Sequence, residues 1–397
     1  MPNKKVLIVS GLQIFPAQSG GQIRTATMAE SLGLLGFDVT IYSYTGRRAD
    51  YLKLRRSSYN VIGQSVKEFT NRNFIYAFIQ LISYRLAIPP LWLTLFSRFY
   101  VPSELRKLIK ESKLVIIDFP FLYPLTKSID RPCILNSHNV EHHIINQQHI
   151  FKNLLTSLIQ KIEINAVKSV DHTMFCTQKD MDFLGVFAKH KFTLVSNGVN
   201  LTKINAIRSE KSRFCMRKKL GITSDTKLVL FSASAYYSNL ESYKFLQLFC
   251  HRNQDLLAGL KLKFLILGSV ADKAIDCRSY ITTSRVDNVY EYFLACDAAI
   301  NPVMLGSGSN IKMAEYISFY LPILTTEFGA RGLNMVDGRD CIHFTRKNLA
   351  LVLESQFTHK NENFFRSISE NAYMNNVMSI DMKTSLRSVK YFIPEEK

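Results

Sequence analysis

The sequence predicts an α/β protein with two consecutive domains, each built on a parallel sheet with helices on both faces. The chain has 397 residues, which is more than one hydrophobic core usually supports. Its composition of 47% apolar and 21% charged residues is typical of a globular protein and excludes a disordered or fibrous one. Short apolar, β-branched runs alternate with segments of helical spacing, and this alternation starts twice along the chain.

The first unit of this pattern lies near the N terminus. Residues 5–10 (KVLIVS) form a continuous apolar run, which is typical of a strand buried on both faces. A loop ending in Gly20 and Gly21 follows, residues 23–35 have helical spacing, and residues 38–44 (DVTIYSY) are the second strand candidate. A strand, a glycine loop, a helix and a strand in this order make a βαβ unit, so we expect a parallel sheet.

The alternation continues and then restarts after a polar, basic stretch that reaches residue 218. The further strand candidates are 114–117, 133–136, 173–176 and 193–196 before this stretch, and 228–232, 263–267, 288–289, 298–303 and 323–325 after it. We therefore expect a first domain over residues 1–200 and a second over residues 201–378. Residues 379–397 are amphipathic with no strand after them, so they would either cap the second domain or cross back to the first.

The chain is strongly basic. It has 50 Lys and Arg against 32 Asp and Glu, a net charge of +18, and residues 53–113 alone carry 11 basic and 3 acidic side chains among many aromatics. A surface of this kind attracts nucleic acid, phosphorylated substrates or an anionic membrane. No known nucleic-acid-binding module is present, so we expect no nucleic-acid partner.

The apolar stretch 74–96 is expected to be a core helix of the first domain. Gln80, Arg85 and a Pro-Pro pair interrupt it, so it falls short of the roughly 20 clean apolar residues of a membrane span. The apolar run at the N terminus is too short for a secretion signal, and the seven cysteines are scattered without zinc-like spacing. These features predict a cytoplasmic protein with reduced thiols and no metal site. The basic flanks favour peripheral association with the inner face of the cell membrane.

The densest signal for a ligand site follows the strand candidate 298–303. A run of small and polar residues opens a helix there: Gly306, Ser307, Gly308, Ser309 and Asn310. Small residues let backbone N–H groups approach a phosphate, and the helix N terminus adds partial positive charge. Lys312 and Glu315 follow on one face, which suits a nucleotide diphosphate with the cation on the phosphates and the carboxylate on the ribose. The alternative is an ordinary Gly-Ser loop followed by a surface lysine and glutamate.

This segment does not have the pattern of a nicotinamide-dependent enzyme or a kinase. The third glycine of the dinucleotide fingerprint is missing, and no acidic residue ends the second strand candidate. A Walker A motif is also absent from the sequence. Both enzyme classes are therefore disfavoured.

A second candidate site surrounds His138. This residue directly follows the strand candidate 133–136, so it lies at the carboxyl edge of the sheet, where open α/β sheets bind ligands. His142 stands four residues later, but no third metal ligand is evident. A catalytic and a structural role for His138 are equally open on this evidence.

Five fragments follow the order of motifs in one enzyme family: residues 16–24 (PAQSGGQIR), 136–141 (NSHNVE), 197–200 (NGVN), 237–239 (YSN), and 306–333 with its GSG and GARGL segments. Together they resemble the GT-B-fold glycosyltransferases of the GT4 type, in a subgroup with G-S-G in place of the first glutamate of the family's E-x7-E pair. The resemblance covers nearly the whole chain. It implies two facing Rossmann-like domains and a C-terminal helix that crosses back to the first domain.

The resemblance also implies roles for individual residues. Glu315 would bind the donor ribose and, with His138 facing the sugar, would be a catalytic residue. Gly308, Ser309 and Lys312 would border the donor diphosphate, and Arg331 could supply a further positive charge. The other donor-binding residues would be Gly306, Ser307 and Asn310. The cleft on the acceptor side would be lined by Gly20, Gly21, Arg24 and Glu141.

The implied function is that of a retaining, metal-independent glycosyltransferase. It would move a sugar from a nucleotide-sugar donor, without any other cofactor, to a glycan or lipid-linked acceptor in surface polysaccharide or glycolipid synthesis. Two alternatives stay open. One is a nucleotide-sugar epimerase of the same fold, and the other is a non-catalytic partner subunit, which is motivated by Ser307 at the position of the family's first glutamate.

Overall fold

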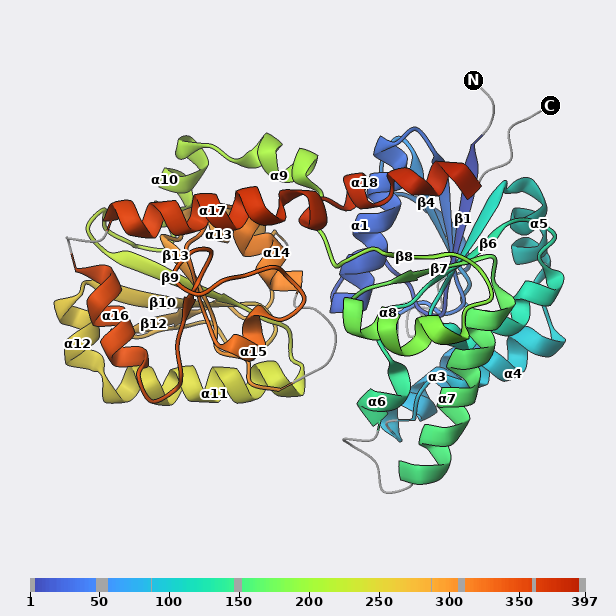
Figure 1. Ribbon diagram of the computed structural model, residues 1–397, viewed down its shortest axis with the longest axis horizontal. Helices are drawn as coiled ribbons and strands as arrows, with labels where there is room; N and C mark the ends of the chain where they lie inside the picture. Colours follow the sequence, from blue (N-terminus) through green and yellow to red (C-terminus); the bar gives the residue numbers. More distant parts are fainter. Residues whose placement is uncertain are drawn as a thin grey trace. The chain divides into compact units, whose positions relative to one another are not determined.

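The computed structural model describes residues 4–47, 56–86, 88–145, 152–286, 288–305, 311–358 and 362–392. The chain forms two compact units. Unit 1 contains Met1–Ser196 and Met382–Lys397, and unit 2 contains Asn197–Asp381. Each unit is an α/β layer structure with a largely parallel sheet between helices, so the predicted fold class is confirmed (Figure 1).

Unit 1 has an eight-stranded sheet with the order β3-β4-β2-β1-β5-β6-β7-β8. The strands are β1 (Lys5–Ser10), β2 (Asp38–Ser43), β3 (Ser58–Val61), β4 (Val66–Thr70), β5 (Leu114–Asp118), β6 (Cys133–Asn136), β7 (His172–Phe175) and β8 (Phe192–Leu194). All pairs are parallel except β3 with β4. In the central register Val6 lies opposite Val39 on one side and Leu114 on the other, as expected for continuous apolar strands.

Helices cover both faces of this sheet. They are α1 (Gly20–Leu34), α3 (Phe74–Arg85), α4 (Leu91–Phe99), α5 (Ser103–Glu111), α6 (Glu141–Ile145), α7 (Lys152–Ser169), α8 (Gln178–Leu184) and α18 (Met382–Ser385), with the 3-10 segments η1 (Pro120–Ser128), η2 (Gly185–Phe187) and η4 (Arg387–Phe392). Helices α1 and α18 lie side by side on one face (Figure 1). The C-terminal segment therefore returns to unit 1.

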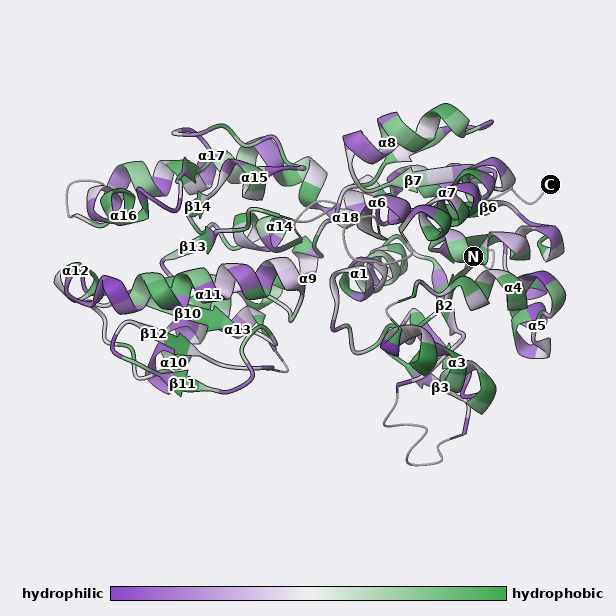
Figure 2. Ribbon diagram, turned by 90° about the horizontal axis from the view of Figure 1, so that it is seen from below, coloured by the Kyte–Doolittle hydropathy of each residue, from purple (hydrophilic) through white to green (hydrophobic). Residues whose placement is uncertain are grey.

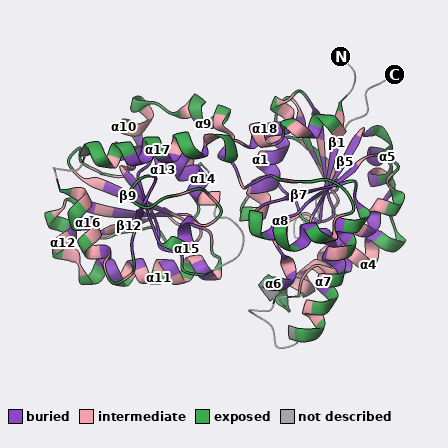
Figure 3. Ribbon diagram, in the orientation of Figure 1, coloured by how far each residue is buried: buried purple, intermediate pink, exposed green. Residues whose placement is uncertain are grey.

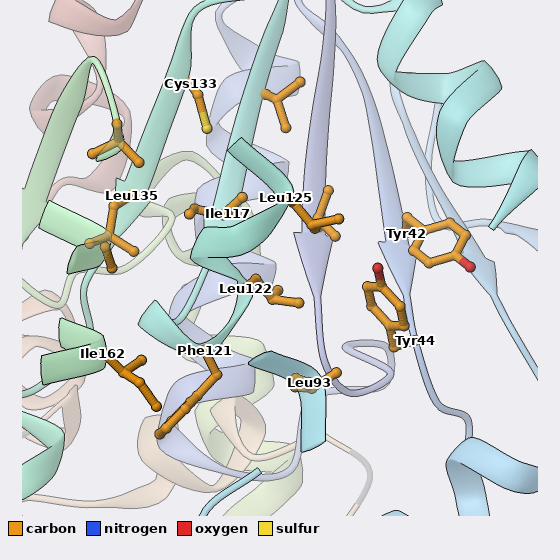
Figure 4. Close-up of a cluster of buried hydrophobic side chains, with 14 of the residues drawn as sticks. Tyr42, Tyr44, Leu93, Ile117, Phe121, Leu122, Leu125, Cys133, Leu135 and Ile162 are labelled. Carbon is orange, nitrogen blue, oxygen red and sulfur yellow. The ribbon is translucent and has the colours of Figure 1, made fainter. Parts of the chain in front are cut away.

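Successive strand residues alternate between two apolar cores in unit 1. Ile8 points into the core under α1 and the C-terminal segment, whereas Val9 points into the core under α3, α4, α5, η1 and α7. Figure 4 shows the second core, where Ile117 of β5 lies near Phe121 of η1 and Ile162 of α7. Figure 3 shows that the strands are buried, while the outer faces of the helices are exposed.

Unit 2 repeats this architecture with the sheet order β11-β12-β10-β9-β13-β14-β15. Its strands are β9 (Lys227–Ser232), β10 (Leu262–Leu267), β11 (Ile275–Asp276), β12 (Tyr280–Thr282), β13 (Ala298–Asn301), β14 (Ile323–Thr325) and β15 (Ile342–His343). Its helices are α9 (Leu201–Ile207), α10 (Glu210–Lys219), α11 (Tyr237–Arg252), α12 (Gln254–Gly259), α13 (Tyr290–Ala295), α14 (Ile311–Ser318), α15 (Glu327–Ala330), α16 (Leu349–Phe357) and α17 (Glu362–Ile380). Only β11 runs antiparallel to its neighbour.

Two sequence predictions need correction. Residues 288–289 are not a strand, because Val289 is the N-cap of α13, and the strand beside β10 is β12 instead. The stretch 74–96 is not one core helix, because Pro89 and Pro90 divide it into α3 and α4, and much of α3 is exposed. In the described part of the chain, no helix combines the length and apolarity required to cross a bilayer.

Candidate active site

Each sheet has one point at which its strand order reverses. In unit 1 this point lies between β1 and β5, and in unit 2 it lies between β9 and β13. Open α/β sheets bind ligands outside the carboxyl ends of the strands at such points. The candidate site residues from the sequence divide between these two edges, and each edge is described on its own.

At the edge of unit 1, His138 forms a buried pair with Asp118. The Nε2 atom of His138 lies 2.6 Å from Oδ1 of Asp118, which also accepts hydrogen bonds from Asn136 and Thr25. Asp118 is fully buried and His138 is 4% exposed. Because a carboxylate only accepts hydrogen bonds, we assign the proton to Nε2, which leaves Nδ1 of His138 as an acceptor.

The ring of His138 is stacked on one face and closely approached by the backbone of Gly21. Phe119 stacks on it with ring centroids 4.1 Å apart and an angle of 10°, and Phe119 adopts a φ of 79°. A Cβ atom on Gly21 would lie 3.2 Å from the Phe119 ring and 3.4 Å from Nδ1 of His138. Gly21 therefore lets the first turn of α1 pass close to the ring, and Gly20 begins that helix.

Arg24 lies beneath this edge, where it is 1% exposed. Its Nε donates to Oδ1 of Asn136 at 3.1 Å, and its Nη1 donates to the carbonyl of Val195 at 2.7 Å. Burial lowers the pKa of the guanidinium. Through Asn136, Arg24 positions the Asp118–His138 pair and does not itself line an open surface.

Glu141 begins α6 near a second buried pair. Its backbone N–H donates to Glu163, and Nδ1 of His142 lies 2.5 Å from the same carboxylate. Burial, together with the charge of Glu163, raises the pKa of Glu141 to about 8. His142 thus pairs with Glu163, not with His138. The described ranges contain no group of three or more His, Cys, Asp or Glu side chains arranged to hold a metal ion.

At the edge of unit 2, Lys312 lies in the first turn of α14. Its ammonium donates to Oδ1 of Asn239 at 2.8 Å and sits 4.7 Å from the centroid of the Phe231 ring. Burial lowers the pKa of Lys312 to about 7; Glu315 acts to raise it and Arg331 to lower it further. An ammonium has three donors, and Asn239 uses one of them.

Glu315 lies one turn further along α14 and is 7% exposed. Burial raises the pKa of its carboxyl to about 7, with the charge of Lys312 opposing the shift. Within the described residues, no hydrogen bond reaches this carboxylate, although a buried carboxylate normally has such partners. The pair therefore presents a cation and an acceptor in a setting of low polarity.

The backbone around this pair is held tightly. The amide of Ser232, at the end of β9, donates to the hydroxyl of Tyr316 at 2.9 Å, which ties α14 to the strand end. A Cβ atom on Gly329 would lie 2.5 Å from Oγ1 of Thr325, so only glycine fits there. Arg331 follows, with its guanidinium 3.9 Å from the Phe328 ring centroid. Its charge acts on Lys312, so the structure brings Lys312, Glu315 and Arg331 together.

Five of the predicted donor-site residues lie outside the described residues: Gly306, Ser307, Gly308, Ser309 and Asn310. Conversely, the structure adds Asp118 and Asn239 to the candidate sites. Asp118 is the last residue of β5, beside the strand-order reversal. The sequence could have indicated it as a site residue, because it is an acidic residue directly after the strand candidate 114–117. The contact of Asn239 with Lys312 joins segments 73 positions apart, which no local pattern shows.

Comparison with known proteins identifies the fold. No protein-family model and no curated protein matches the sequence. Among solved structures, sucrose-phosphate synthase from Thermosynechococcus elongatus aligns with a TM-score of 0.64 at 11% identity, covering 98% of both chains. A glycosyltransferase from Rickettsia africae aligns with a TM-score of 0.65 at 14% identity. HepE of Anabaena in complex with UDP-glucose aligns with a TM-score of 0.63 at 13% identity, and both alignments cover 98% of both chains.

The chain has the GT-B fold. At these identities the likeness concerns the fold and not the chemistry. Within this fold, unit 1 includes the returning C-terminal segment, and unit 2 carries Lys312 and Glu315 near its strand-order reversal.

Proposed function

We propose that this protein is a glycosyltransferase that uses a nucleotide-sugar donor. The observation that carries the proposal is the buried carboxylate of Glu315 together with the half-buried Lys312 at the carboxyl edge of the unit 2 sheet. The fold supports it, since structures with this fold include a complex of Anabaena HepE with UDP-glucose. We take UDP-sugars as the first donors to test.

In this proposal the donor diphosphate binds Lys312 and Arg331, and the ribose hydroxyls donate to Glu315. A bound diphosphate would raise the pKa of Lys312 and keep its ammonium charged. Two cations in a partly buried site stabilise negative charge more strongly than they would in bulk water. The charge that develops on the leaving nucleoside diphosphate is thereby neutralised by side chains, and no metal ion is required.

The reaction breaks the bond between the anomeric carbon and the diphosphate oxygen and forms a bond to an acceptor hydroxyl. A departing phosphate oxygen takes the acceptor proton, which suits transfer with retention of configuration. His138, held by Asp118, offers Nδ1 as an acceptor for a sugar hydroxyl.

For the acceptor we propose a glycan or a lipid-linked glycan in surface polysaccharide or glycolipid synthesis. The net charge of +18 supports an anionic, membrane-associated acceptor. Glu141 lies near the acceptor edge in this scheme, and its raised pKa suits a neutral carboxyl that donates to a sugar oxygen at pH 7.

A second candidate function is that of a partner subunit that binds a nucleotide sugar without turning it over. Ser307 favours it, because an acidic side chain at that position is part of the pattern that the chain otherwise resembles. The two functions differ in product formation and not in donor binding.

The test is a thermal-shift screen against UDP-, GDP-, ADP- and CMP-sugars, followed by calorimetry on the ligands that stabilise the protein. We expect one class to bind and the variant Glu315→Gln to bind it at least about tenfold more weakly, whereas Glu354→Gln on α16 serves as the matched control. No binding by any class, or equal binding by both variants, contradicts the proposal. Binding without sugar transfer to any acceptor supports the partner subunit, and release of an altered sugar indicates an epimerase.

A further inference from the structure

Helix α3 presents an apolar face outward. Its exposed apolar residues are Phe74 (72%), Ile75 (60%), Phe78 (54%) and Ile82 (41%), and Leu86 (57%) follows the helix. Phe78 and Ile82 follow Phe74 by four and eight residues, which places them along one side of the helix. Figure 2 shows the apolar character of this helix on the outside of unit 1.

The opposite face of α3 is also apolar, and it is already covered. Tyr76 is 4% exposed and packs against Trp92 and Phe96 of α4. A surface helix of a soluble domain normally carries polar residues on its outer side. Because α3 is apolar on both sides, its outer side exposes an apolar surface, and such surfaces mark interaction sites.

The surroundings of this face are cationic. Arg85 follows Phe74 by eleven residues and so lies on the same side, and it is exposed. Arg98 is exposed at the end of α4, close to the exposed ring of Phe99. From residue 69 to residue 103 the sequence contains no Asp or Glu. The face therefore combines exposed aromatic rings with positive charge.

The two acids that flank this segment in the sequence, Glu68 and Glu104, belong to β4 and α5. Glu68 is buried, and its carboxylate accepts hydrogen bonds from two backbone amides, those of Ile14 and Phe15. Glu104 accepts a hydrogen bond from the hydroxyl of Tyr59. An apolar helix face with Arg85 at its end suits the interface of an anionic bilayer, where the rings enter the acyl region and the guanidinium group meets a lipid phosphate.

We propose that the outer face of α3 docks the protein on an anionic lipid bilayer. A second copy of this chain fits less well, because the face carries Arg85 and the segment from residue 69 to residue 103 offers no acid to pair with it across a symmetric interface. The docking surface is built from unit 1 alone, so the proposal stands independently of the nucleotide-sugar site. If both hold, docking brings the enzyme to acceptors that are anchored in lipid.

The first experiment measures sedimentation with phosphatidylcholine vesicles, with and without 30% phosphatidylglycerol. We expect the wild-type chain to bind the anionic vesicles, and Phe78→Ser with Ile82→Ser to reduce the partition coefficient at least roughly tenfold. The matched control is Phe214→Ser, a phenylalanine that is 69% exposed on α10 of unit 2, and it should bind as the wild type does. Binding should weaken as salt is raised.

A second readout keeps the proposal testable if the double variant folds poorly. Trp92 is the sole tryptophan of the sequence, so the variant Trp92→Phe has no tryptophan fluorescence. In this variant, Phe78→Trp places a single fluorescent tryptophan on the outer face of α3. The emission maximum of this tryptophan should shift to shorter wavelength when anionic vesicles are added. The emission maximum of Phe214→Trp, made in the same Trp92→Phe variant, should stay unchanged.

Three outcomes overturn the proposal: no binding to the anionic vesicles, binding that the Phe78 and Ile82 changes leave intact, or a dimer in sedimentation velocity that the same changes dissolve. Nucleotide-sugar binding is measured without vesicles, so its failure is distinguished from failure of docking.

Discussion

Lys312 and Glu315 share one helix turn, and burial moves their pKa values toward each other, to about 7 in both cases. Above pH 7 the lysine loses its charge, and below pH 7 the glutamate gains a proton. Diphosphate binding needs the ammonium and ribose binding needs the carboxylate, so donor affinity should be highest near neutral pH.

We expect the donor affinity to fall about tenfold per pH unit above 7, because only the charged lysine binds. On the acid side it should fall again as Glu315 is protonated. Calorimetry from pH 5.5 to 9 checks both limbs, and Glu315→Gln should remove the acid limb alone. A flat profile would show that neither group contacts the ligand.

Gly21 gives a residue-scale prediction for unit 1. In Gly21→Ala the added methyl group comes 3.2 Å from the ring of Phe119, so this ring, which stacks on His138, must shift and disturb the placement of the imidazole against Asp118. Turnover should drop about tenfold or more, since catalysis depends on placement of such groups. The melting temperature should change little, because alanine favours the helix. Gly259→Ala, which meets no atom within 4 Å, is the control, and equal turnover by both variants contradicts the assigned role of His138.

At the residue scale, the sequence supplied the candidates but not their arrangement. His138 could be predicted because it directly follows a strand candidate, and Lys312 and Glu315 because they follow a run of small residues that opens a helix. The contact of Lys312 with Asn239 and that of His138 with Asp118 depend on which strands are neighbours in the sheet, and no spacing in the chain encodes this.

At the scale of elements, the loop before α1 is held by β4. The buried carboxylate of Glu68 accepts hydrogen bonds from the amides of Ile14 and Phe15, at 2.6 and 3.0 Å, and from the hydroxyl of Ser43. These bonds fix the path that leads to Gly20 and Gly21. Burial raises the pKa of Glu68, and the hydrogen bonds from the amides oppose the shift.

Glu68→Gln should therefore lower the free energy of unfolding by about 1–3 kcal/mol, because an amide group satisfies only part of this set of donors. Glu111→Gln, which breaks an exposed pair with Lys5, should cost less than about 1 kcal/mol. Urea unfolding of both variants measures the difference. Equal midpoints would show that the loop does not depend on β4.

The strands with continuous apolar runs were predicted correctly, since burial on both faces leaves a clear signature. Strands β3 and β4 were missed because they are short and carry no continuous apolar run: the four residues of β3 alternate between partly buried and exposed, and the five residues of β4 between buried and more exposed. Strand β12 was missed for a similar reason, and Val289 was assigned to a strand although it caps a helix. Short elements at sheet edges take their structure from neighbours more than from their own residues.

At the scale of the whole molecule, unit 1 is completed by the end of the chain. Met382, Leu386 and Val389 are buried in the core that α1 shares with the sheet, and the Phe392 ring lies 4.3 Å from that of His172. The chain leaves unit 1 at Ser196 and returns at Met382. The amphipathic pattern of the last residues predicted a docked segment, and the family resemblance, not the pattern, indicated which unit receives it.

Leu386→Ala should destabilise unit 1 by about 2–5 kcal/mol, because it opens a cavity in a filled core. Tyr391→Ala, at a side chain that is 79% exposed, should have little effect. Calorimetric unfolding of the full chain should show an earlier transition for the first variant only. Coincident transitions would mean that the segment contributes no stability.

The central claim is that the ammonium group of Lys312 binds the diphosphate of a nucleotide sugar. The most direct measurement compares the nucleoside diphosphate of the donor class that binds with its free nucleoside, each against wild type and Lys312→Ala by calorimetry. We predict that the substitution weakens the diphosphate about 10- to 100-fold, as expected for a charge-assisted contact, and leaves the nucleoside within about twofold. Equal losses for the two ligands, or no loss for the diphosphate, would contradict the account.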